Sequence, residues 1–175
     1  KTFESWVGQL FSNWSDNFST ELKLSYRDYV AERAPWSNLP SVRVNIGNQG
    51  LLFGTEVNTH VNVVDTTEQN LFFAGTYYAG NHTLKFGVDY ANNDIMNFYG
   101  RDLNGSYTFA SLADFAAGKP SQYTVRTPRP GRDYGDIPAT YVFENTGLFL
   151  QDNWAVNYNL NLLFGLRVDI PEFDR

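Results

Sequence analysis

The stretch NLNLLFGLRVDI, residues 159–170, alternates along its whole length between two sets of side chains. The first set is apolar: Leu160, Leu162, Phe164, Leu166, Val168 and Ile170. The second set is Asn159, Asn161, Leu163, Gly165, Arg167 and Asp169. Because successive side chains of a β-strand point to opposite faces, this period of two predicts a strand with two different faces. The stretch exceeds the roughly 5–6 residues of a usual strand and is closer to the roughly 9–11 that cross a bilayer when tilted.

Two other stretches show the same alternation. After Thr20, the apolar residues Leu22, Leu24 and Tyr26 alternate with Glu21, Lys23, Ser25 and Arg27. From residue 84, the apolar residues Leu84, Phe86, Val88 and Tyr90 alternate with Lys85, Gly87, Asp89 and Ala91. In every case one face is apolar or aromatic, and the other carries charges and small residues.

An aromatic residue and an asparagine precede each of these strands at the same spacing. The rings are Trp14, Tyr78 and Trp154, and three residues after each comes Asn17, Asn81 or Asn157. Asparagine tolerates the left-handed backbone of a tight turn, and another strand-like stretch lies upstream of each ring. The repeat predicts three hairpins with short turns, at about residues 3–33, 62–99 and 140–171.

The segments between the hairpins, about residues 34–59 and 100–139, have a different character because they are rich in Pro and Gly. Within the second, SLADFAAG predicts one short helix, with Ser111 as N-cap, Asp114 in the first turn and Gly118 at the C-terminal end. Short turns therefore lie at one end of the strands and long loops at the other.

Composition excludes several classes of protein. The 175 residues are 42% hydrophobic and 17% aromatic, carry a formal net charge of −6, and include no cysteine. No run approaches the roughly 18 apolar residues of a membrane helix. An acidic chain does not neutralise phosphates, so we expect no nucleic-acid partner. Without cysteine there is neither a disulfide scaffold nor a thiolate zinc site.

Two architectures fit long antiparallel strands with one apolar face. In a soluble sandwich or barrel the apolar face points inward; in an outer-membrane barrel it meets lipid. Periodicity alone does not separate them. Strand length, rings at the strand ends, and short turns opposite long loops favour the membrane. We therefore predict an all-β fold, an antiparallel transmembrane β-barrel segment of about six long strands with short periplasmic turns and long extracellular loops.

Three stretches resemble the barrel of TonB-dependent outer-membrane receptors of the Oar-like group, which carry a carboxypeptidase-regulatory-like N-terminal extension. They are NWSDNFSTELKLSYRDY (13–29), GNHTLKFGVDYANNDIMNFY with SYTFASLADFAAGKPSQY (80–123), and TGLFLQDNWAVNYNLNLLFGLRVDIP (146–171). Together they cover more than half of the chain in the family's order. The resemblance implies a plugged barrel of about 22 strands in the outer membrane of a Gram-negative bacterium. It also implies a partner, the TonB energy-transducing complex, which would act through the plug.

Six strands are fewer than the roughly 8 of the smallest membrane barrels. We therefore expect residues 1–175 to be part of one barrel domain, without the plug and N-terminal domains. The remaining barrel strands and the plug of the same receptor would be partners, together with outer-membrane lipid.

No residues form a convincing catalytic or metal-binding set, so we predict a protein that is not an enzyme and has no cofactor and no metal site. His60 and His82 are read as polar turn or interface residues. The run from Asp102 to Ser106 begins like a calcium loop but lacks the later ligands of an EF-hand, so it is read as a turn.

The alternating charges would share one face of the sheet. In a barrel they would line the lumen, and in a soluble sheet they would face water. They are Glu21, Lys23, Arg27, Lys85, Asp89, Arg167 and Asp169. In the barrel, Trp14, Tyr78 and Trp154 would form an aromatic girdle at the periplasmic interface; their alternative role is hairpin packing.

Candidate ligand contacts lie in the long loops, where rings and cations are mixed as at many recognition surfaces. They are Tyr99, Arg101, Tyr107, Phe109, Phe115, Tyr123, Arg126, Arg129, Arg132 and Tyr134. The same residues would also stiffen tall loops by packing on one another.

The leading hypothesis is part of a TonB-dependent receptor that binds an unidentified substrate and admits it across the outer membrane. Two alternatives remain open at this point. One is a soluble all-β module that binds a glycan or another ligand, and the other is an outer-membrane adhesion or structural protein without transport.

Overall fold

The computed structural model describes residues 1–174, and its backbone forms two compact units. One unit comprises Lys1 with residues 30–65 and 96–139, and the other comprises residues 2–29, 66–95 and those from Thr140 onward. We call the six-stranded sheet the wall sheet, although the ends of four of its strands belong to the first unit, and we call the remainder of the first unit the loop unit.

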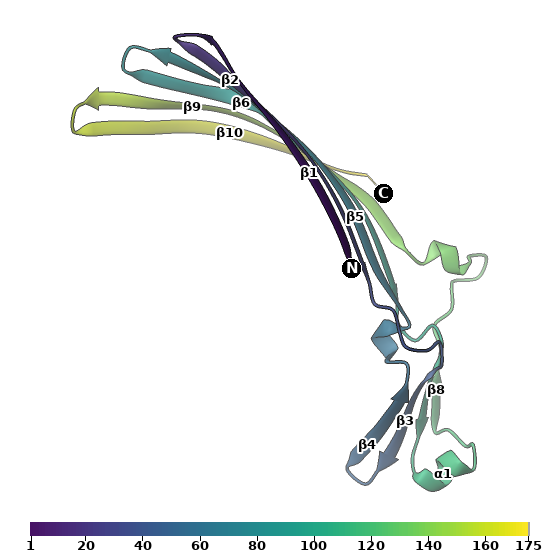
Figure 1. Cartoon of the computed structure of the whole chain (residues 1–175). Coiled ribbons are helices and arrows are strands. Elements are labelled where there is room, and N and C mark those ends of the chain that lie inside the picture. The colour runs from purple at the N-terminus through teal and green to yellow at the C-terminus, as the bar shows by residue number, and fades with distance from the viewer. Residues whose placement is uncertain (175) are drawn as a thin grey trace. The chain divides into compact units, whose positions relative to one another are not determined.

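The wall sheet contains six strands in the order β1-β2-β5-β6-β9-β10 (Figure 1). The strands are β1 (Thr2–Ser15), β2 (Phe18–Glu32), β5 (Val61–Ala79), β6 (His82–Gly100), β9 (Ala139–Asn157) and β10 (Leu160–Asp174). Each contains 14 to 19 residues. At about 3.3 Å per residue, even the shorter strands are long enough to cross a hydrocarbon layer of roughly 30 Å.

Pairing between β9 and β10 shows how the two faces arise. Leu166 lies opposite Leu150, and Val168 lies opposite Leu148. Because directly opposite residues point to the same side, this side is apolar. Arg167, which points to the other side, lies opposite Phe149. We call these sides the apolar face and the charged face.

Nothing in the wall sheet forms an ordinary hydrophobic core. Ala74 is fully buried there, whereas Leu166 is 79% exposed and Trp14 is 69% exposed. A sheet that leaves its large apolar side chains uncovered needs another apolar phase against that face.

The loop unit contains a four-stranded sheet in the order β4-β3-β7-β8 (Figure 1). Its strands are β3 (Ser41–Ile46), β4 (Gln49–Gly54), β7 (Ser106–Phe109) and β8 (Gln122–Thr124). β3 pairs antiparallel with β4 and parallel with β7. Short helical turns η1 (Val57–Thr59) and η2 (Tyr134–Asp136) complete the unit with helix α1 (Leu112–Ala116).

Helix α1 confirms the helix predicted in this segment. The Ser111 side chain accepts a hydrogen bond from the backbone N–H of Asp114 at 3.1 Å, and Gly118 has a φ of +64° beyond the last turn. The small sheet is a feature that the sequence analysis did not predict. Its strands are short, and β3 and β7 come from segments about 60 residues apart. A local pattern in the sequence therefore does not predict that they pair.

Candidate functional site

Ion pairs on the charged face connect strands of the wall sheet. Lys85 Nζ lies 3.6 Å from Glu21 Oε2, although β5 lies between their strands. Arg27 Nη1 lies 3.0 Å from Glu68 Oε2 of the adjacent β5. Lys23 lines the same hollow of this face as Glu21 and Arg27.

A second group of charges gathers toward β10. Arg167 Nη2 lies 3.4 Å from Asp89 Oδ2 and 2.8 Å from Asp169 Oδ1. The Asn145 side chain also donates to Asp169, at 3.2 Å. The structure thus gathers all seven charges predicted to share a face on one side of the sheet. It adds Glu68, which sequence alternation in the second hairpin could have included.

Two aromatic rings stack on each other among these charges. Phe72 and Phe149 stack with ring centroids 5.7 Å apart and planes at 11°, and Lys85 Nζ lies 5.6 Å from the Phe72 centroid. A Cβ at Gly87 would lie 2.7 Å from Phe149, so this glycine lets the ring lie against the sheet. Gly147 makes room for the Arg167 guanidinium in the same way.

The apolar face has a polar boundary near the three short turns. We call this boundary the lower rim. Trp14 Nε1 donates to Thr20 Oγ1 at 2.9 Å. Trp154 stacks on His82, with centroids 5.4 Å apart, and His82 Nδ1 lies 2.7 Å from Asp152 Oδ2. An indole ring that combines an apolar body with a bonded N–H, as Trp14 does, is typical of a membrane interface.

Tyr78 lies on the other face. A Cβ at Gly75 would touch Phe86, so Gly75 points to the apolar face. By strand alternation Tyr77 points there too, and Tyr78 points to the charged face. Of the three rings expected in the girdle, Trp14 and Trp154 therefore lie on the apolar face, as does Tyr77, whereas Tyr78 does not.

A second polar boundary crosses the apolar face farther from the turns. We call this boundary the upper rim. Three rings there each donate to a carboxylate. Trp6 Nε1 donates to Glu4 at 2.6 Å, Tyr26 Oη to Asp28 at 3.4 Å, and Tyr90 Oη to Glu144 at 2.6 Å. Alternation along the sequence predicts Tyr26 and Tyr90 on the apolar face but does not predict this rim. The signal was a carboxylate or amide two residues beyond each tyrosine.

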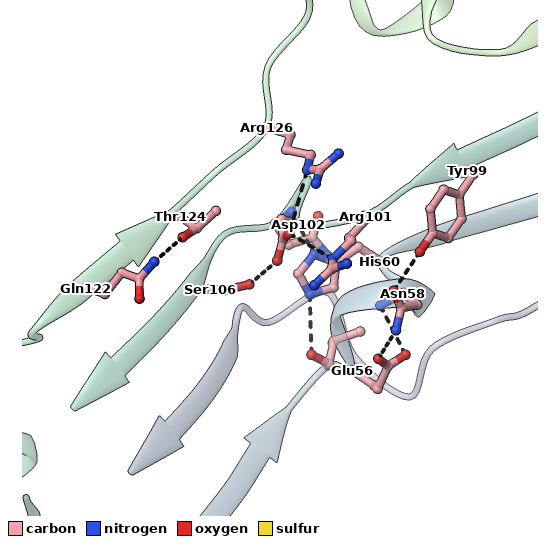
Figure 2. Close-up of polar contacts among 12 residues, drawn as sticks. Glu56, Asn58, His60, Tyr99, Arg101, Asp102, Ser106, Gln122, Thr124 and Arg126 are labelled. Carbon is pink, nitrogen blue, oxygen red and sulfur yellow. Dashed lines mark hydrogen bonds and ion pairs between the residues drawn. The ribbon is translucent and has the colours of Figure 1, made fainter. Parts of the chain in front are cut away.

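In the loop unit, Asp102 contacts three segments of the chain: its own turn with Arg101 and Ser106, the segment of Arg126, and the segment of Val57 (Figure 2). We call this set of contacts the Asp102 node. Asp102 is 5% exposed and has a φ of +59°. Its carboxylate accepts a hydrogen bond from Ser106 and lies 3.3 Å from Arg101 Nε and 3.8 Å from Arg126 Nε. Its backbone N–H donates to the carbonyl of Val57 at 3.2 Å. The run that begins like a calcium loop is therefore a turn whose acid is satisfied by protein donors.

His60 supports the same node. It is 3% exposed, and Nδ1 accepts the backbone N–H of Asn104 at 3.1 Å. Nε2 lies 3.3 Å from the carbonyl oxygen of Thr55. A neutral ring protonated on Nε2 satisfies both contacts, so His60 ties the loops together.

Most of the loop rings predicted to contact a ligand pack on one another. Tyr107 lies 4.6 Å from Tyr123 between centroids, and Phe109 lies 5.1 Å from Phe115 edge to face. Phe53, which the sequence analysis did not single out, meets Phe115 at 5.4 Å. These rings pack together beside Phe109, which is 8% exposed, whereas Phe115 is 41% and Tyr123 52% exposed.

Four other candidate loop contacts lie outside this cluster of rings. Tyr99 Oη donates to Asn58 at 2.6 Å and Tyr134 is 52% exposed. Arg132 lies 3.7 Å from Asp136 and lines one hollow with Arg129. The ten candidates thus divide into three sets. The packed group is Tyr107, Phe109, Phe115 and Tyr123; the open group is Tyr99, Arg129, Arg132 and Tyr134; and Arg101 and Arg126 pair with Asp102.

Within residues 1–174, no three His, Cys, Asp or Glu side chains are grouped so that they could hold a metal ion.

No helix in the described part of the chain is both long enough and apolar enough to cross a membrane.

Comparison of the chain with known proteins identifies a family and a similar solved structure. A family model described as "Outer membrane beta barrel domain" matches residues 8–173. The solved structure of the copper transporter OprC is similar to this chain with a TM-score of 0.53 and 18% sequence identity. The similarity covers 98% of this chain and 22% of that one, so the chain spans less than a quarter of that structure. No curated protein matches.

Proposed function

The chain belongs to the outer membrane beta barrel domain family, and from this premise we propose that it forms part of the barrel wall of a TonB-dependent receptor. This receptor would bind a substrate at its loops and admit it across the outer membrane. The protein lies in the outer membrane, as its family does, and the all-β fold class predicted from the alternation is confirmed.

The observation that carries the proposal is the separation of charge between the two faces. Arg27, Lys85 and Arg167 all form ion pairs on the charged face. Turned toward lipid at the bilayer midplane, each would cost about 2–4 kcal/mol. The charged face therefore lines the lumen and meets the plug or the hydrated substrate path, while the apolar face meets lipid.

The orientation follows from the loops. Outer-membrane barrels have short periplasmic turns and longer extracellular loops. The lower rim then lies at the periplasmic interface, and the loop unit faces the outside, where the open group of rings and arginines contacts substrate. The protein works by binding and gating and catalyses no reaction. The plug and the TonB complex are the partners that would make uptake energised, and the Oar-like group remains the proposed subfamily.

Single cysteines test the orientation cleanly because the chain has none of its own. Asn48→Cys in the β3–β4 turn should react with an impermeant maleimide on intact cells. Asn81→Cys in the β5–β6 turn should react after the outer membrane is permeabilised. The reverse pattern would show that the loops face the periplasm.

Transport is tested by comparing solutes in the periplasm by mass spectrometry. The strains would lack the protein, carry it, or carry it without TonB. We expect at least one solute to require both. A solute that requires the protein but not TonB would contradict energised uptake, and no difference among the strains would favour a structural or adhesive role.

A further inference from the structure

Strand β4 lies at one edge of the small sheet in the loop unit, beside β3 (Figure 1). A two-residue turn joins β3 to β4, so that Ile46 lies opposite Gln49. Because hydrogen-bonded and non-hydrogen-bonded pairs alternate from such a turn, the backbone N–H and C=O groups of Gly50 and Leu52 point away from β3. Within residues 1–174, no strand of this sheet lies beyond β4 to bond them.

β4 lacks the features that usually keep a free edge from pairing. Its sequence, QGLLFG, contains no charged residue and no proline, although both are common on free edges. Leu51 is 52% exposed on one face of the strand, and Leu52 is 65% exposed on the other. The strand at the opposite edge, β8, has only three residues, QYT. An apolar edge such as β4 is typical of a strand that pairs with a further segment.

Arg43 of β3 lies across this edge strand. It is opposite Leu52, and a Cβ at Gly50 would lie 2.9 Å from Arg43 Cζ, so the guanidinium lies over Gly50. Arg43 Nε donates to Asn45 Oδ1 at 3.0 Å, and no carboxylate of the described residues forms an ion pair with Arg43. A carboxylate on a segment paired with β4 would satisfy this cation.

We propose that β4 pairs with an extended strand from another extracellular loop of the same receptor, and that this strand places an Asp or Glu beside Gly50, in contact with Arg43. Adjacent strands lie about 4.8 Å apart, so a side chain beside Gly50 is within reach of the guanidinium. The inference rests on the proposed function, in which the remaining strands and loops of the barrel lie outside residues 1–175.

A loop of the same receptor is the occupant for two reasons. Tethering to the same barrel gives such a loop a high effective concentration at β4. An apolar edge left open at the cell surface would instead pair with whatever extended chain it met. The sheet of the loop unit therefore continues into a neighbouring loop.

Hydrogen exchange of the purified full-length receptor, resolved to single amides by mass spectrometry, tests the pairing. The two amides concerned are those of Gly50 and Leu52, and the reference is an unstructured peptide of the same sequence. We expect both amides to exchange at least about tenfold more slowly than in the peptide. Exchange at the rate of the peptide would overturn the proposal, because the edge of β4 would then be free in the receptor.

Arg43→Lys tests the chemistry and the source of the paired segment, because a carbodiimide joins the lysine amine to a carboxylate in contact with it. We expect mass spectrometry to identify an Asp or Glu of another extracellular loop of the same polypeptide. A carboxylate of a different polypeptide, or one within residues 1–175, would overturn the proposed source. The absence of any crosslink would overturn the proposed ion pair. Gln122→Lys on β8 is the matched control and should not be joined to that loop.

Asn48→Cys separates failure of this inference from failure of the proposed function. Asn48 lies in the turn that precedes β4. If the cysteine reacts with an impermeant maleimide on intact cells while the amides of Gly50 and Leu52 exchange freely, only the strand pairing is wrong. If the cysteine reacts only after permeabilisation, the loop unit does not face the outside, and the proposed function and this inference fail together.

Discussion

Arg167 Nη2 lies 3.4 Å from Asp89 Oδ2, although the whole of β9 separates their strands. The next residue back, Leu166, points to the opposite face and is 79% exposed. Two adjacent residues of β10 thus differ completely: Arg167 forms an ion pair across the sheet, and Leu166 is an uncovered apolar side chain. This contrast is what a wall between water and lipid requires, and it can be tested at adjacent positions.

Leu166→Arg should destabilise the folded barrel by about 2–4 kcal/mol, because the charge would be placed in lipid. Arg167→Leu should cost no more than about 1 kcal/mol, since it removes an exposed ion pair. Urea unfolding of the full-length protein in phospholipid vesicles would measure both free energies. Equal costs at the two positions would contradict the assignment of the faces.

Two glycines of the wall should respond in opposite ways to a side chain. Gly87→Val places atoms against the Phe149 ring and the backbone of Phe73, so overpacking should cost roughly 1–3 kcal/mol or more. Gly8→Val meets open space and should be tolerated. The fraction of protein that migrates as the folded form in unheated gel samples would report the difference. A Gly87→Val variant that folds as well as Gly8→Val would show that close seating of Phe149 is unimportant.

Alternation predicts the wall because a period of two is a local property of the chain, and of residues 159–170 all but the first lie in β10. The ring-to-asparagine spacing predicted the turns but not the face of each ring. Beside the β9–β10 turn the register shifts between Leu160 and Asn161, and one such step changes the face to which a ring points. The spacing therefore grouped Tyr78 with Trp154, whereas the structure places them on opposite faces.

The loop unit was less accessible to sequence reasoning. Residue type alone identifies its aromatic rings, but the packing around Phe109 depends on β3 pairing with β7, a contact between distant segments. The sequence shows Asp102 only as the start of a run that begins like a calcium loop. Its role as a node depends on Arg126 and Val57, which are remote in sequence.

Asp102→Ala should loosen the loop unit. It removes an acceptor that satisfies Ser106 and two arginines in a buried position. Losing a hydrogen bond to a charged group costs roughly 1.5–3 kcal/mol, equivalent to about a tenfold to hundredfold rise in the open population. Cleavage of the loops by protease added to intact cells should accelerate accordingly.

The exposed Lys119→Ala serves as the control for Asp102→Ala and should leave the cleavage rate unchanged. Unaltered cleavage of Asp102→Ala itself would mean that the carboxylate does not hold the three segments together.

The two groups of loop residues should separate recognition from folding. Tyr134 is 52% exposed and Phe109 is 8% exposed. Tyr134→Ala should lower uptake of the substrate severalfold while the loops stay resistant to protease, because the ring is free to contact a ligand. Phe109→Ala should lower uptake and protease resistance together, since truncating a buried Phe costs roughly 3–5 kcal/mol. Substrate uptake and protease resistance would be measured on the same cells. Normal uptake in Tyr134→Ala would show that Tyr134 does not contact the substrate. Protease-resistant loops in Phe109→Ala would show that Phe109 does not hold the loop unit together.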